Sequence, residues 1–175
     1  MTPIAPLVTG FLRERLEIER RASPHTCDTY AYAIQLLLEF TGKRLRTRPS
    51  ALQFEHIDAL LILEFLKHLQ KERKNGPRTC NARLAAIKSF MKYAEHRIPV
   101  ALEQIRQVLA IPIQRTDSRV PRYLDSAQTK ALLDGPDARV TDGLRDRAML
   151  YLALTGGLRV SELVGLRMED LSFRD

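Results

Sequence analysis

The sequence predicts an all-α protein, and three observations carry this prediction. Apolar residues recur at helical spacing along most of the 175 residues. Residues that cap or break helices separate these stretches, notably Ser23-Pro24, Pro77 and Gly156-Gly157. Hydrophobic residues make up 45% and charged residues 28% of the chain, which is the composition of a globular protein with a buried core.

Residues 1–110 are predicted to form a first unit of four to five helices. The first helix carries apolar residues from Ile4 to Leu16. Thr26 is expected to cap a second helix that ends at Gly42, and residues 43–49 are expected to form a basic loop. A third helix should bury Ile57, Leu60, Leu61, Phe65 and Leu69, and a fifth is expected over residues 99–109.

Pro77 opens the fourth helix, whose two faces differ in chemistry. At about 100° per residue, one face gathers Cys80, Leu84, Ile87, Met91 and Ala94. The opposite face carries the basic stripe, which consists of Arg78, Asn81, Lys88 and Lys92 with Ala85 and Ser89 among them. Bases between small residues allow close approach to phosphates, so the stripe predicts polyanion contacts. A plain solvated face is the alternative.

Residues 111–122 are predicted to be a linker, because they hold two prolines and no helical period. Asp125, with Gln128 three residues on, should cap a short helix of the second part. A longer helix should run from Thr141 to Gly156-Gly157, and a short one should begin near Ser161 and Glu162. We expect the apolar face of the longer helix to be exposed; it consists of Leu144, Ala148, Tyr151 and Leu152.

The positive charge lies in the first part of the chain. Lys and Arg total 28 against 21 acids, a net charge of +7. Residues 1–116 hold 19 bases and 11 acids, whereas residues 117–175 hold 9 bases and 10 acids. This asymmetry favours a polyanion-binding module followed by a part with another task, although a generically basic surface is the alternative. Lys43, Arg44 and Arg46 of the basic loop are further candidate phosphate contacts.

Several function classes find no support in the sequence. The four histidines lack metal-ligand spacing, and the two cysteines are too few for a disulfide framework or a thiolate metal site. Glycine-rich phosphate loops and nucleophile-elbow serines are also absent. We therefore expect no metal, no cofactor and no small-molecule substrate. Charged residues 13–15 and the lack of a long apolar run predict a cytoplasmic chain without a membrane partner.

One segment carries a recognisable motif. It reads Thr155-Gly156-Gly157-Leu158-Arg159-Val160-Ser161-Glu162-Leu163, followed by Leu166-Arg167-Met168-Glu169-Asp170-Leu171. This segment resembles the first arginine box of the tyrosine recombinase (phage integrase) family, T-G-L-R-x-S-E-L followed by L-x-x-x-D-(I/L). Gly156 departs from the pattern, which usually has Thr there. Residues 78–84 and 90–94 resemble the family's core-binding domain, and Tyr123-Leu124 resembles the start of its catalytic domain.

The resemblance implies a Xer-like recombinase with a SAM-like helical core-binding domain over residues 1–110. Residues 123–175 would then be the N-terminal fragment of the catalytic domain. In this family a tyrosine hydroxyl attacks a DNA phosphodiester and forms a 3′-phosphotyrosine intermediate. Arg159 would bind the scissile phosphate, since a guanidinium holds two non-bridging oxygens at once. Glu162 would either orient Arg159 or cap the following helix.

The family's lysine, its His-x-x-Arg pair and its nucleophilic tyrosine lie C-terminal to this box. None of the four histidines here is followed three residues later by Arg, and all five tyrosines precede Arg159. We therefore expect a truncated chain that binds double-stranded DNA without cleaving it, with other recombinase protomers on that DNA as a further option. The alternative is a non-catalytic helical module, binding DNA or protein, that competes with a full-length recombinase.

Overall fold

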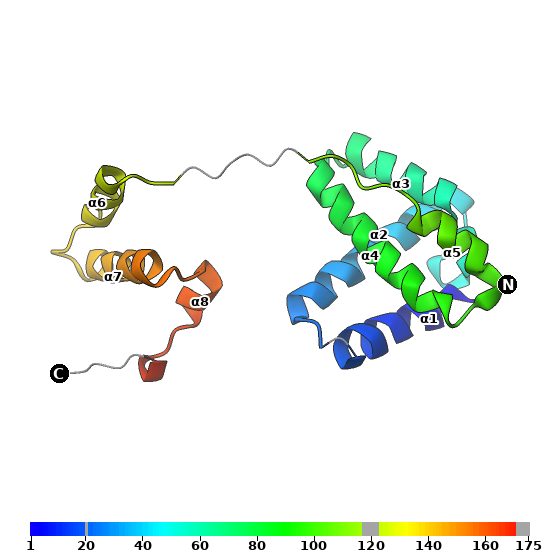
Figure 1. The fold of residues 1–175 in the computed structure, drawn as a ribbon, viewed down its shortest axis with the longest axis horizontal. Helices are drawn as coiled ribbons and strands as arrows, with labels where there is room; N and C mark the ends of the chain where they lie inside the picture. Colours follow the sequence, from blue (N-terminus) through cyan, green and yellow to red (C-terminus); the bar gives the residue numbers. More distant parts are fainter. Residues whose placement is uncertain (20, 117–122, 171–175) are drawn as a thin grey trace. The chain divides into compact units, whose positions relative to one another are not determined.

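The computed structural model describes residues 1–19, 21–116 and 123–170. These residues form eight α-helices with short 3-10 turns, and no β-strand occurs among them. None of the helices in the described ranges combines the length and apolarity needed to cross a bilayer. The chain divides into two compact units, Met1–Ser118 and Arg119–Asp175 (Figure 1). The predicted all-α class is confirmed.

The first helix changes its winding partway along. α1 (Ile4–Gly10) continues into a π-helical stretch over Phe11–Glu19, where the sequence predicted a single regular helix. Phe11 and Leu16 are both buried. Residues five apart lie closer to one face in a π-helix than in an α-helix, because its hydrogen bonds join residue i to i+5. The wider winding therefore lets both side chains enter the core.

α2 (Pro24–Leu45) begins earlier and ends later than the sequence predicted. Ser23, not Thr26, is the capping residue, since its hydroxyl accepts the Thr26 N–H at 3.3 Å and Pro24 takes the first helical position. The helix passes through Gly42 and ends at Leu45, followed by the capping residue Arg46, whose φ is 52°. Gly42 serves close packing instead, because a Cβ there would lie 2.8 Å from the Thr47 carbonyl oxygen.

The remaining helices of the first unit are α3 (Ala59–Lys71), α4 (Pro77–Glu95) and α5 (Leu102–Leu109). Asp58 caps α3 by accepting the Leu61 N–H at 2.7 Å. The predicted inward face of α3 is wrong at Leu60, which is 73% exposed, because the buried face is centred one residue further on. It consists of Leu61, Ile62, Phe65, Leu66 and Leu69.

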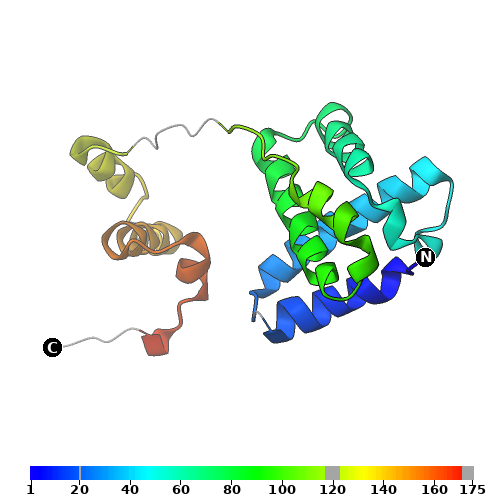
Figure 2. The same ribbon diagram turned by 45° about the vertical axis from the view of Figure 1, so that its right-hand side comes forward.

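The core of the first unit surrounds α4, which contacts α2, α3 and α5 (Figure 2). The predicted apolar face of α4, Cys80 to Ala94, is buried as expected. Phe11 packs edge-on against Phe90 with 5.5 Å between ring centroids, and Phe54 and Phe65 are fully buried as well. Helix α4 is therefore held firmly on its apolar side, and this fixes the direction in which its opposite face points.

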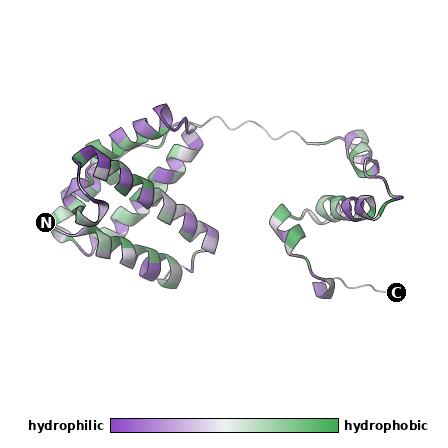
Figure 3. Cartoon of the chain, turned by 180° about the vertical axis from the view of Figure 1, so that it is seen from behind, coloured by the Kyte–Doolittle hydropathy of each residue, from purple (hydrophilic) through white to green (hydrophobic). Residues whose placement is uncertain are grey.

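The second unit consists of α6 (Ser126–Asp134), α7 (Thr141–Gly156) and α8 (Val160–Gly165). Asp125 and Gln128 form the predicted capping box, and Gly157 ends α7 with a φ of 62°. Gly143 is the only buried residue among those described in this unit, and Figure 3 shows hydrophobic colour on the surface of α8. On α7, Leu144 is 55% and Tyr151 44% exposed, in line with the expected exposed face.

Candidate nucleic-acid interface

The basic stripe of α4 begins and ends with unpaired bases. Arg78 lies in the first turn of α4 and Lys92 in its last, and both side chains are exposed. Within the described part of the chain, neither has a hydrogen-bond or ion-pair partner. Since the opposite face of α4 is buried, both cations point to solvent and are available to an anionic ligand.

Asn81 and Lys88, between these two bases, bind the chain's own backbone. The Asn81 side chain donates to the Gln114 carbonyl at 2.8 Å and accepts the Gln114 N–H at 2.8 Å. The Lys88 ammonium donates to the carbonyls of Leu109 at 2.7 Å and Ile111 at 2.5 Å. The structure thus gives these two stripe residues a structural task that the sequence did not reveal.

A hollow of about 550 Å³ lies beside the second half of the stripe. Its lining combines two lysines, two hydroxyl groups and two apolar side chains: Tyr30, Ala85, Lys88, Ser89, Lys92 and Leu109. Ammonium and hydroxyl groups are common donors to phosphate oxygens, and Ala85 leaves room for close approach. The hollow therefore has the chemistry of a phosphate-contact surface.

The predicted basic loop is partly helical, because Lys43 and Arg44 belong to the last turn of α2 and Arg46 is its C-terminal cap. Cations at this position interact favourably with the helix dipole. Arg44 also forms a two-point ion pair with Glu64, at 3.0 and 3.3 Å, and this hydrogen bond and charge raise the pKa of Arg44. Lys43 and Arg46 have no such partner among the described residues and line an open hollow with Arg48.

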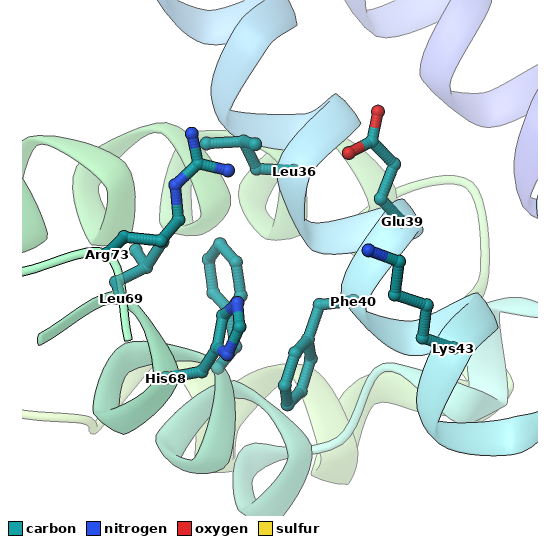
Figure 4. A pocket seen from close by; sticks show the side chains of 8 residues that line it. Leu36, Glu39, Phe40, Lys43, His68, Leu69 and Arg73 are labelled. Atoms are coloured by element: carbon teal, nitrogen blue, oxygen red, sulfur yellow. The ribbon is translucent and has the colours of Figure 1, made fainter. Parts of the chain in front are cut away.

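Lys43 also stands at the rim of a small cavity between α2 and α3 (Figure 4). Its floor is aromatic: the Phe40 ring centroid lies 5.1 Å from that of His68 and 5.6 Å from that of Phe65. The cavity holds about 50 Å³, which is far below the ~300 Å³ at which small-ligand pockets begin. We assign it no ligand.

A group of bases around the turn between α3 and α4 was not predicted from the sequence. Lys71, Arg73 and Lys74 lie within four residues there and are exposed, and Arg73 donates to the Tyr32 hydroxyl at 3.2 Å. The charge run itself was the available signal. Arg83, which is half-buried, lies with its guanidinium over the Tyr32 ring, 4.8 Å from the ring centroid.

Arg159 occupies the start of α8, at its N-terminal cap position. The Glu162 carboxylate accepts both the Arg159 N–H at 2.8 Å and a guanidinium N–H at 3.0 Å. Glu162 therefore caps the helix and also contacts the guanidinium of Arg159. The Arg159 side chain remains 82% exposed, so its outer face is accessible to a phosphate.

Among the described residues no group of three or more His, Cys, Asp or Glu side chains is placed to hold a metal ion. The predicted linker is described only over residues 111–116, and its arginines Arg119 and Arg122 lie outside the described residues.

Two family models match the chain. The model for the N-terminal SAM-like domain of phage integrase matches residues 8–97, and that for the phage integrase family matches residues 122–175. The chain belongs to the phage integrase family. The first match covers α2 to α4, and the second covers α6 to α8 with Arg159.

Curated relatives agree with this family. A protein named as an integrase/recombinase, y4rC, from Sinorhizobium fredii is 44% identical over 97% of this chain and 51% of its own length. Its y4rD counterpart is 40% identical over 96% of this chain and 60% of its own length. The tyrosine recombinase XerC of Pelotomaculum thermopropionicum is 33% identical over 89% of this chain and 50% of its own length. The chain spans about half the length of the relatives it matches, and no solved structure matches it.

Proposed function

We propose that this chain is the DNA-binding front part of a site-specific tyrosine recombinase. The observation that carries the proposal is the basic stripe of α4, which stands on the buried core of a unit matching the phage integrase SAM-like domain. Double-stranded DNA is the polyanion that this family association favours. A DNA partner agrees with the cytoplasmic location expected from the sequence, and other protomers on the same DNA stay a prediction.

The two ends of the stripe are proposed as the main phosphate contacts. Arg78 and Lys92 are exposed and have no partner among the described residues, so their binding to phosphate breaks no internal contact. Lys43 and Arg46 are proposed as a second group. Arg44 should contribute less than these, because its ion pair with Glu64 competes with phosphate.

The proposed domain organisation follows the same division. Residues 1–110 form the core-binding domain, residues 111–122 connect, and residues 123–175 begin the catalytic domain. Support comes from the two compact units and from the two family matches, which leave residues 98–121 between them.

Arg159 is the proposed binding group for the scissile phosphate. Charge develops on the non-bridging oxygens when a phosphodiester is attacked, and a guanidinium held in place stabilises that charge. The contact with Glu162 supports this role, because it pairs the guanidinium with a carboxylate at the start of α8.

These 175 residues alone are proposed to bind DNA without cleaving it. One phosphate contact supplies about 3–4 kcal/mol by analogy with a single oxyanion-hole donor, whereas even a modest enzyme supplies about 8 kcal/mol. A nicked suicide duplex incubated with the chain should give no covalent protein–DNA adduct on a denaturing gel. An adduct that disappears when one of the five tyrosines is changed to Phe would contradict this.

Binding itself is tested by fluorescence anisotropy with a labelled duplex over a range of salt concentrations. About six neutralised phosphates give a slope of about −5 in the plot of log affinity against log salt. Affinity that does not change between dilute and physiological salt would exclude the proposed interface, and the chain would then be a helical protein-interaction module.

A further inference from the structure

The segment after α5 is fastened along α4 by side chains. Lys88 binds the carbonyls of Leu109 and Ile111, and Asn81 binds both polar backbone groups of Gln114. From α3, Gln70 donates to the Gln114 side chain at 2.6 Å. We call residues 109–114 the strap; they follow the surface of α4 in Figure 1.

The strap runs antiparallel to α4. Its residue numbers rise from 109 to 114 while those of their partners on α4 fall from 88 to 81. Seven helical residues span about 10 Å, and three to five extended residues span about 10–16 Å. The two lengths match, so the strap is drawn out along two turns of α4 with Ile111 buried in the core as its apolar anchor.

This course brings the next residue, Arg115, to the N-terminal end of the basic stripe. Arg115 lies one Cα step, about 3.8 Å, beyond Gln114, and Arg78 precedes Asn81 by about one helical turn. Both arginines are exposed, and neither has a partner among the described residues. An arginine that belongs to the linker in sequence thus joins the charge of α4.

We propose that Arg115 is a phosphate contact of the DNA interface and that Asn81 is its positioning residue. The proposal rests on the DNA-binding function proposed above. Asn81 acts through Gln114, because its amide has one donor and one acceptor directed at the matching groups of that residue. In this arrangement Asn81 has no direct base or phosphate contact, unlike its assignment from the sequence.

The experiment measures anisotropy of a labelled duplex of about 30 base pairs in mixed sequence, at several salt concentrations, with the 175-residue chain. Arg115→Ala removes the proposed phosphate contact, and Asn81→Ala removes the side chain that holds Gln114 and so positions Arg115. Gln114→Pro removes the N–H that Asn81 accepts while leaving every side chain of α4 intact. Gln114→Ala is the matched control, since it removes only the side-chain bond with Gln70 and keeps the backbone pair with Asn81. Arg106→Ala, on α5, controls for the loss of one positive charge. Far-ultraviolet circular dichroism checks that each variant retains its helices.

Arg115→Ala is expected to weaken binding about three- to tenfold and to reduce the magnitude of the salt slope by about 0.9. Asn81→Ala and Gln114→Pro should each reproduce most of this loss, and Gln114→Ala and Arg106→Ala should not. In the double variant Asn81→Ala/Arg115→Ala the losses should not add, because both act on one contact.

Other results would overturn the inference. Unchanged binding by Arg115→Ala would remove Arg115 from the interface. Additive losses, with Gln114→Pro still binding fully, would mean that Asn81 touches DNA itself. A wild-type chain that fails to bind any duplex would instead refute the proposed function, and the inference with it.

Discussion

The two units of this chain hold their candidate functional groups by different means. In the first unit, four fully buried phenylalanines and the apolar face of α4 fix the direction of the basic stripe. In the second unit, Gly143 alone is buried among the described residues, and Arg159 is held by the carboxylate of Glu162 three residues away. The basic stripe is therefore positioned by a hydrophobic core, whereas Arg159 is positioned by a local helix cap.

This difference indicates which unit can keep its functional groups in place without the other. Side chains on an element packed on several sides keep their geometry without further help. A short helix such as α8, six residues long and exposed at Val160 and Val164, gains little stability from its own backbone hydrogen bonds. We therefore expect DNA binding to be a property of the first unit.

The largest difference between the two units is expected in how much a side-chain deletion lowers the free energy of unfolding. Phe90→Ala in α4 is expected to lower the free energy of unfolding by about 3–5 kcal/mol, because it removes a fully buried ring. Tyr151→Ala in α7, whose side chain is 44% exposed, should change it by less than about 1 kcal/mol. Hydrogen exchange resolved by region measures both. Equal losses in the two variants would mean that α7 has a core of its own.

Two glycine substitutions should affect the stability of the second unit differently. A Cβ at Gly143 would overlap the carbonyl oxygen of Asp137, which closes the turn before α7. Gly143→Ala should therefore destabilise the packing of α6 on α7 by about 1–3 kcal/mol. Gly165→Ala is the matched control, since a Cβ there meets no atom within 4 Å. Protection of α7 amides against exchange reports the result, and equal behaviour of the two variants would contradict it.

A smaller effect concerns pH and the first unit. Glu55 accepts hydrogen bonds from the Thr2 N–H and hydroxyl at 3.0–3.1 Å, and these lower the pKa of Glu55. The stabilisation is fully present above the ordinary glutamate value of about 4.3 and is lost as pH falls through the lowered pKa. Because the carboxylate is largely solvated, we expect less than about 1 kcal/mol. Glu55→Gln should remove this part of the acid dependence in urea titrations; an unchanged profile would exclude Glu55 as its source.

The sequence predicted the helices well where local chemistry decides them. Asp125 with Gln128, Pro77 and Gly157 all behave as their residue types predict. The errors arose where tertiary packing decides: Gly42 lies inside α2 because a neighbouring carbonyl requires a small residue, and Leu60 is exposed because α3 turns a different face inward.

The candidate site shows the same limit. Helical periodicity placed Asn81 and Lys88 on the face of α4 opposite the core, but it carries no information about a segment 21 to 33 residues later that uses their polar groups. For the same reason the sequence kept residue 111 in the linker, whereas the structure buries Ile111 in the core of the first unit. Long-range backbone partners of polar side chains are visible only in three dimensions.

If the basic stripe of the first unit binds DNA, its removal changes the salt dependence of affinity. The salt slope of the 175-residue chain is compared with those of Arg78→Ala/Lys92→Ala and Arg159→Ala. The account predicts that the double variant loses about 1.8 from the magnitude of the slope, one step for each phosphate contact. Arg159→Ala removes at most one phosphate contact and should reduce the magnitude of the slope by no more than about 0.9. An unchanged slope in the stripe variant, or a loss confined to Arg159→Ala, would contradict the account.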